Sequence, residues 1–258
     1  MPACESVTAG GLLLGVGLLL LLRSSHESHQ ARLLAKLPVS PCGRVREGLV
    51  LASGRAVSSA SLSSLVLGLP CIISECTLEA YWGPGRKEGW KAVARSREAV
   101  PFYIEDATGR TWVDPADAEW WLLPDVEYSA GKRWKPTAGH LVKFGGTELT
   151  AELLEQRARQ CCERQNADAG KRRLRFRERN VMAGDTVTVL GPAYAAPAGH
   201  TGAAEVRIHR VHPGDPFVIG DGPPAAVAAR MRKQAGWIRG AGLGCMALGA
   251  ALVIHCYV

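Results

Sequence analysis

The sequence predicts a mainly β domain held between two transmembrane α-helices. Three observations predict this fold. Each end of the 258-residue chain carries an apolar run without fixed charge, the middle alternates short β-like segments with turn residues, and one amphipathic segment interrupts them. So many short strands separated by turns suit a small, partly open antiparallel barrel or a sandwich with one inserted helix.

The first apolar run covers residues 7–22 and is dominated by Leu and Gly. As a helix it is about 24 Å long, so neighbouring residues or local thinning must complete a span of about 30 Å of hydrocarbon. A cleaved signal peptide is the alternative. Residues 1–6 hold an acid and no base, and no small-residue cleavage site follows cleanly, so we expect a short tail and then a membrane helix.

The second apolar run covers residues 240–258, which is long enough to span a bilayer. A juxtamembrane helix over residues 223–239 is expected to run into it. Trp237 stands just before the run, where an aromatic anchor meets the membrane interface. We therefore expect an integral membrane protein with two transmembrane segments and a lipid bilayer as its first partner.

Basic residues flank both apolar runs on the side that faces the middle of the chain, and none lies on the outer sides. Because positively charged flanks stay in the cytoplasm, both runs independently place the middle domain there and both short tails outside. The flanking residues are also candidates for contact with anionic headgroups. These candidates are Arg23, Arg32 and Lys36 after the first run, and Arg230, Arg232 and Lys233 before the second.

Each apolar run also carries a GxxxG pattern, Gly11 with Gly15 and Gly240 with Gly244. Glycine lets two helix backbones approach closely in lipid. The hypothesis is that these faces pack together or form a homo-oligomer. Because glycine is common in membrane helices, chance occurrence is the alternative.

The middle of the chain is expected to begin with a juxtamembrane linker over residues 23–43 and to continue as a soluble β domain over 44–222. Its clearest element is a β-hairpin over residues 102–114, where Asp106 starts the turn and Gly109 supplies the positive φ. Other strands are expected at residues 45–56, 71–81, 90–94, 186–190, 206–211 and 217–219, and a helix at 148–165.

A run of basic residues, 171–179, lies inside the β domain. One interpretation is a half-buried strand with Leu174 and Phe176 on one face and a solvated face opposite. The other is contact with anionic headgroups, in which Lys171, Arg172 and Arg173 join the membrane-surface candidates. Periodicity alone leaves both interpretations open.

The net charge of +7 sits partly in these three basic regions, and no nucleic-acid motif accompanies it, so we expect no nucleic-acid partner. The eight cysteines form no CxxC pair and no zinc spacing. The sequence therefore predicts reduced thiols, no metal site and no cofactor. Cys71 and Cys76 are expected on one strand, and Cys161 and Cys162 in the core.

Several stretches, in the same order along the chain, resemble the GIDE family, also called the MULAN or BAM (beside-a-membrane) domain. They are residues 48–56, 64–71, 101–115, 177–191 and 216–219, followed by the closing helix, so that the resemblance covers roughly residues 40–258. The resemblance implies a β-rich domain between two membrane helices. Leu65 replaces the Pro that the family usually carries after the Ser of the second stretch, which affects the shape of that loop.

Eukaryotic members of this family carry a RING finger after the second helix and act as ubiquitin ligases. The sequence ends at Val258, so we expect a form without a RING. The leading hypothesis is therefore a non-catalytic, membrane-tethered module that binds a protein partner or the bilayer surface. The alternative is a ubiquitin transferase that uses a RING from another chain or a thiol. Cys71 is the weak candidate for that thiol, since it is the cysteine in a family-like motif.

Overall fold

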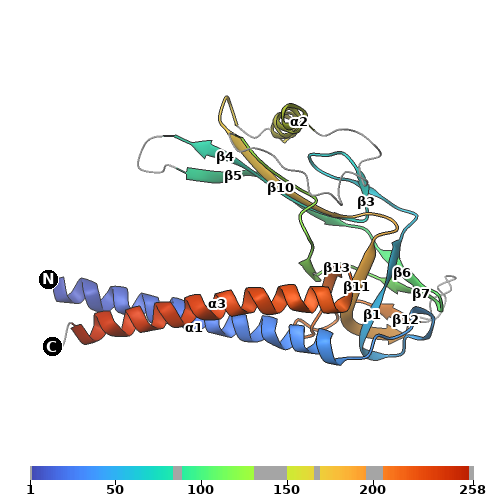
Figure 1. Cartoon of the computed structure of the whole chain (residues 1–258), viewed down its shortest axis with the longest axis horizontal. Helices are drawn as coiled ribbons and strands as arrows, with labels where there is room; N and C mark the ends of the chain where they lie inside the picture. The colour runs from blue at the N-terminus through green and yellow to red at the C-terminus, as the bar shows by residue number, and fades with distance from the viewer. Residues whose placement is uncertain (1, 84–88, 131–149, 166–168, 196–205, 256–258) are drawn as a thin grey trace. The chain divides into compact units, whose positions relative to one another are not determined.

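The computed structural model describes residues 2–83, 89–130, 150–165, 169–195 and 206–255 (Figure 1). The chain divides into two compact units. One is Val39–Asp221, and the other combines Met1–Pro38 with Gly222–Val258. Each unit is described by itself.

The first part of the larger unit is a closed five-stranded barrel. Its strands follow the order β1, β6, β7, β12 and β11, and β1 pairs with both β6 and β11 to close the ring. The sequence predicted a partly open barrel, and closure is decided by the long antiparallel register from Gly48 opposite Ala193 to Arg55 opposite Thr186. The strands are β1 (Gly48–Val57), β6 (Phe102–Asp106), β7 (Gly109–Val113), β12 (Val206–Ile208) and β11 (Thr186–Ala195).

Two further strands extend the barrel sheet beyond β11, namely β13 (Val218–Asp221) and β8 (Glu119–Trp121). The barrel interior is filled by alternate residues of these strands, among them the fully buried Phe102 and Ile104 of β6, and by Phe217, which immediately precedes β13 and is also fully buried. Burying one such side chain contributes about 1.5–3 kcal/mol. Gly191 is required here, because a Cβ at this position would lie 2.6 Å from the Phe217 ring.

The predicted hairpin is confirmed as β6 and β7, which pair from Phe102 opposite Val113 to Asp106 opposite Gly109. The Asp106 carboxylate accepts the Thr108 N–H at 2.7 Å, and Gly109 has a φ of 142°. The same carboxylate accepts the N–H of Cys42, which begins the short 3₁₀ helix η1 (Cys42–Arg44). Local turn chemistry was therefore enough to predict this element.

A four-stranded sheet forms the second part of the larger unit, in the order β5, β4, β10, β9. One face packs on α2, where Leu78, Leu174 and Phe176 meet Leu154 and Ala158. Thr150 caps α2 by accepting the Leu153 N–H at 3.2 Å. The elements are β5 (Gly89–Ala99), β4 (Ile73–Trp82), β10 (Leu174–Val181), β9 (Val126–Ser129) and α2 (Ala151–Arg164).

Two strand predictions need correction. Cys71 and Cys76 do not share a strand. Cys71 ends β3 (Pro70–Cys71), which pairs with β2 (Leu62–Ser63), and Cys76 lies in β4, which begins at Ile73. The strand expected at residues 90–94 is longer and runs from Gly89 to Ala99 as β5. In both cases pairing with the preceding strand, β2 for β3 and β4 for β5, sets the bounds of the strand.

The smaller unit is a pair of long antiparallel helices, α1 (Pro2–Lys36) and α3 (Pro224–His255), which run side by side in Figure 1. Both are long and apolar enough to cross a membrane, because each contains an 18-residue stretch with a mean hydropathy of 1.6. Residues 23–36, predicted as linker, continue α1 as helix. The residues expected to form a helix before the second apolar run are helical, because α3 is continuous from Pro224.

Candidate functional site

The helix pair is held together by a set of glycines that differs from the two GxxxG pairs. A Cβ on Gly17 would lie 2.9 Å from the Gly242 carbonyl oxygen, and a Cβ on Gly249 would lie 2.8 Å from that of Gly10. Further along, the Ser24 hydroxyl donates to the Ala235 carbonyl at 2.8 Å. These contacts follow one antiparallel register, which only small residues permit at such close approach.

The glycines predicted from sequence, Gly11, Gly15, Gly240 and Gly244, have no atom within 4 Å of an added Cβ. Contact between the two helices of one chain therefore does not use them, because they point away from the partner helix. Self-association through these four glycines stays a prediction.

The basic flanks of the two apolar runs come to the same end of the helix pair, because the antiparallel register places Ser24 beside Ala235. On this end Arg32, Lys36, Arg232 and Lys233 are exposed and Arg230 is half-buried. Arg23 is also exposed and forms an ion pair with Glu27 at 3.2 Å. The sequence predicted these residues as membrane-surface candidates, and the fold gathers them into one collar.

Cys71, the weak catalytic candidate, is a buried thiol. It is 1 % exposed, and its Sγ lies 3.7 Å from the Leu62 carbonyl oxygen across the small ladder. Burial raises the pKa of Cys71 to about 11. The thiolate is the nucleophilic form, and such a pKa leaves about one thiol in ten thousand ionised at pH 7.

Other described thiols of the larger unit, Val39–Asp221, which we call the β unit, share this environment. Cys161 and Cys162 of α2 are buried in the core, as predicted, and burial raises the pKa of both. Burial likewise raises the pKa of Cys42 to about 12. In the described part of the chain no three His, Cys, Asp or Glu side chains are grouped so that they could hold a metal ion.

The face of the four-stranded sheet opposite α2 is lined by arginines, and we call it the arginine face. Alternate residues of β10 point to this face, since Leu174, Phe176 and Glu178 between them point to the core. The register with β4 and β5 places further charges beside them. The arginines of this face are Arg95 and Arg97 of β5, Arg173 just before β10, and Arg175, Arg177 and Arg179 of β10.

Glutamates are interleaved with these arginines. Arg175 pairs with Glu79 at 2.6 Å, and Arg179 pairs with Glu75 at 2.6 Å. Arg177 pairs with Glu127 on β9. Among the described residues, the arginine face thus carries six arginines and three glutamates. It has a net positive charge, with negative charges between the positive ones.

At one end of the same sheet, aromatic rings and cations stack on each other. We call this cluster the aromatic–basic tip. Trp82 carries the Arg172 guanidinium at 3.7 Å and the Lys91 ammonium at 5.0 Å from its ring centroid. On the arginine face, Arg173 lies 4.4 Å from Tyr81 and Arg175 lies 4.6 Å from Trp90. The cluster therefore covers both faces of the sheet at this end.

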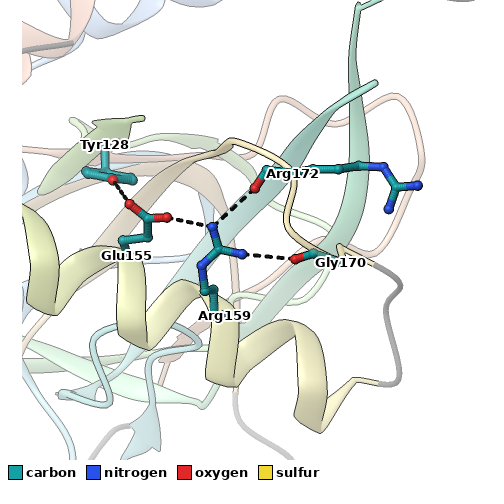
Figure 2. Close-up of polar contacts among 5 residues, drawn as sticks. All are labelled: Tyr128, Glu155, Arg159, Gly170 and Arg172. Atoms are coloured by element: carbon teal, nitrogen blue, oxygen red, sulfur yellow. Dashed lines mark hydrogen bonds and ion pairs between the residues drawn. The ribbon is translucent and has the colours of Figure 1, made fainter. Parts of the chain in front are cut away.

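The helix α2 holds the chain segment that leads into this tip (Figure 2). Arg159 donates to the carbonyl oxygens of Gly170 at 3.0 Å and of Arg172 at 3.3 Å. Glu155 forms an ion pair with Arg159 at 2.6 Å and accepts a hydrogen bond from the Tyr128 hydroxyl at 2.8 Å. Figure 2 shows the Arg172 side chain directed away from this network, while the Arg172 backbone carbonyl is held by Arg159.

Two pKa shifts report the same network. The hydrogen bond from Arg159 lowers the pKa of Glu155, which is thus held ionised. Burial, and then the hydrogen bond to Glu155, raise the pKa of Tyr128 to about 12, so its hydroxyl stays a donor. The network is therefore fixed in one protonation state across the neutral range.

The sequence predicted part of this cluster and missed the rest. The basic run made Lys171, Arg172 and Arg173 candidates, and Lys171 and Arg173 are exposed in the structure. The aromatic partners Tyr81, Trp82 and Trp90 were missed, because they come from strands far away in sequence. The available signal was the aromatic pair at the end of one predicted strand and the Trp at the start of the next.

Comparison with known proteins gives one family. The family model GIDE, described as E3 ubiquitin ligase, matches residues 77–254. This range holds β5 to β13, the aromatic–basic tip and almost all of α3. No curated protein and no solved structure matches the chain. Because the family model covers well over half of the sequence, the chain belongs to the GIDE family.

Proposed function

We propose that this GIDE protein is a membrane-anchored, non-catalytic binding module whose arginine face takes an acidic segment of a protein partner. Its helices α1 and α3 cross the bilayer, and the β unit lies in the cytoplasm. The collar of basic residues at one end of the helix pair supports this orientation, since positive flanks stay on the cytoplasmic side.

The observation that carries the proposal is the arginine surplus on a sheet face that packs on no described helix of the β unit. Arginine is enriched where proteins meet, because its planar guanidinium binds carboxylates through two hydrogen bonds. The glutamates at positions 75, 79 and 127 give the face an alternating charge pattern. Alternation favours a partner with its own charge pattern, such as a protein, over a uniformly anionic surface.

A photo-crosslinker at Thr77 tests the proposal, because Thr77 lies between Arg95 and Arg177 in register. In membranes that hold the full chain, a discrete protein adduct is expected, and the double variant Arg95→Glu/Arg177→Glu should lose it. A crosslinker at the exposed Gln156 of α2 is the matched control. Lipid adducts alone, or a protein adduct that survives the double variant, would contradict the proposal.

The family description favours a second candidate function, transfer of ubiquitin. In this form the chain would act with a RING supplied by another chain, or through a thiol such as Cys71. The buried position of Cys71 supports the first route over the second. The test is a ubiquitin-transfer assay of the full chain in nanodiscs, with and without an added RING protein, comparing wild type with Cys71→Ser. Transfer by wild type that the serine variant loses would favour the thiol route and contradict a non-catalytic module.

A further inference from the structure

The aromatic–basic tip differs in chemistry from the rest of the arginine face. It brings three aromatic rings, those of Tyr81, Trp82 and Trp90, together with four cations, and the Tyr81 and Trp90 rings meet edge to face at 5.4 Å. Trp and Tyr settle at the membrane–water interface, where one end of the ring is apolar and the other is wet. Lysine and arginine side chains are attracted to an anionic leaflet.

Charge balance separates the tip from the centre of the sheet. The cations in ring contact are Lys91, Arg172, Arg173 and Arg175, and the exposed Lys171 lies next to them in sequence. Glu79 forms an ion pair with this group through Arg175. Further along the strands, glutamates alternate with the arginines, so the tip is the part of the sheet better suited to a uniformly negative surface.

We propose that the aromatic–basic tip docks the β unit on the anionic headgroups of a lipid bilayer. The stacked rings orient the guanidinium groups of Arg172 and Arg173, whose N–H groups bind lipid phosphate and carboxylate oxygens. The Trp82 and Trp90 rings then sit at the interface. This proposal rests on the membrane anchoring in the proposed function and is independent of a protein partner on the arginine face.

The anchor makes weak docking sufficient. A site tethered to the membrane by its own chain sees the bilayer surface at a high effective concentration, so weak headgroup contacts change its occupancy strongly. The Arg159 bonds to the carbonyls of Gly170 and Arg172 keep the basic segment in place, so that little ordering is left for the docking step.

The experiment uses the full chain in nanodiscs that carry brominated lipid, a contact quencher of tryptophan fluorescence. Discs of phosphatidylcholine alone are compared with discs that include about 30 % phosphatidylserine, enough for a strong surface potential. The tip quenching is defined as the quenching of wild type minus that of Trp82→Phe/Trp90→Phe. We expect tip quenching in the anionic discs. It should be much smaller in the neutral discs and in anionic discs at about 1 M salt.

Charge variants locate the contact. Arg172→Gln/Arg173→Gln should reduce the tip quenching at least several-fold. Lys91→Gln should also reduce it, but by less. Arg95→Gln/Arg177→Gln removes the same charge from the centre of the arginine face and should leave the quenching unchanged. Lys91 is exposed, so its variant separates lost docking from lost folding.

Three outcomes would overturn the proposal. Wild type and the double Phe variant could be quenched equally in anionic discs, the tip difference could be as large in neutral discs, or the central variant could lower it as much as the tip variant. Crosslinking at Thr77 reports separately on the protein partner, so failure of tip docking and failure of the proposed function are distinguishable.

Discussion

Glu178 of β10 accepts the backbone N–H of Leu67 at 3.0 Å, in the interior of the four-stranded sheet. The same carboxylate accepts the Val66 N–H at 3.1 Å, while its side chain is fully buried. Arg157 of α2 donates to the Leu67 carbonyl from the other side. The loop that carries Leu65 in place of the usual proline is therefore held by a buried acid rather than by a proline ring.

This contact makes stability depend on pH in a definite direction. Burial is the largest influence on the Glu178 carboxyl and raises its pKa above the ordinary value of 4.5, although the two N–H groups oppose the shift. Because the pKa is higher in the folded state, Glu178 adds to the free energy of unfolding below pH 4.5. This contribution is lost as pH rises through the pKa of the folded state. Glu178→Gln, which keeps one acceptor, should flatten this slope.

The measurement is thermal unfolding of the full chain in detergent, followed by circular dichroism between about pH 4 and pH 8, where a raised carboxyl titrates. We expect the difference between wild type and Glu178→Gln to change with pH in the stated direction. Glu178→Ala should cost about 1–3 kcal/mol at the acid end of this range, because two buried N–H groups lose their acceptor, and this cost should shrink as pH rises. A pH-independent difference would contradict the assignment.

Arg159 of α2 should control the tip without contacting any lipid. Arg159→Gln removes the bonds to the Gly170 and Arg172 carbonyls and frees the segment before β10. We expect faster amide hydrogen exchange at Arg172 and its neighbours and weaker tip quenching in anionic nanodiscs. Arg164→Gln, at the last residue of the same helix, is the control and should change neither measurement.

The thiol of Cys71 should resist alkylation in the folded protein. Its burial and raised pKa, about 11, predict a modification rate at pH 7 that is several orders of magnitude below that of a free thiol. The measurement is mass spectrometry after iodoacetamide treatment of the full chain, with a denatured sample as reference. Rapid labelling of Cys71 in the folded sample would revive the thiol route for ubiquitin transfer.

The two sets of glycines in the helix pair should respond differently to the same change. Gly242→Leu places its Cβ 3.1 Å from the Gly17 carbonyl oxygen and should weaken the contact between α1 and α3. Gly244→Leu meets open space and should leave that contact intact. Disulfide formation between cysteines placed at Ser24 and Ala235 measures the contact in membranes.

Self-association of the same variants tests the homo-oligomer prediction. If the outward glycines mediate it, Gly244→Leu should lower energy transfer between labelled chains in bilayers. Unchanged transfer would count against an oligomer that uses this face.

Orientation is tested by a cysteine introduced at the exposed Gln156 of α2, in a chain whose Cys4 and Cys256 are replaced by Ser. The thiols of Cys42, Cys71, Cys76, Cys161 and Cys162 are buried. An impermeant maleimide should label Gln156→Cys in cells only after the membrane is permeabilised, because positive flanks keep the β unit in the cytoplasm. The wild-type thiols Cys4 and Cys256 should be labelled without permeabilisation. The reverse pattern would place the β unit outside.

Elements that depend on neighbouring residues could be predicted from the chain alone. Two uncharged apolar runs predicted α1 and α3, Asp106 and Gly109 predicted the β6–β7 hairpin, and the spacing of apolar residues predicted α2. Turn chemistry, hydropathy and helical periodicity act within a few residues, so they can be read along the chain.

Which distant residues meet could be learned only from the folded molecule. Barrel closure requires Gly48 to lie opposite Ala193, and the tip assembles Tyr81, Trp90 and Arg173 from separate segments of the chain. The packing glycines differ from the predicted ones because one residue turns a helix by about 100°, which moves a side chain from one face to another. Register and rotation of this kind are set by long-range packing, which local pattern does not encode.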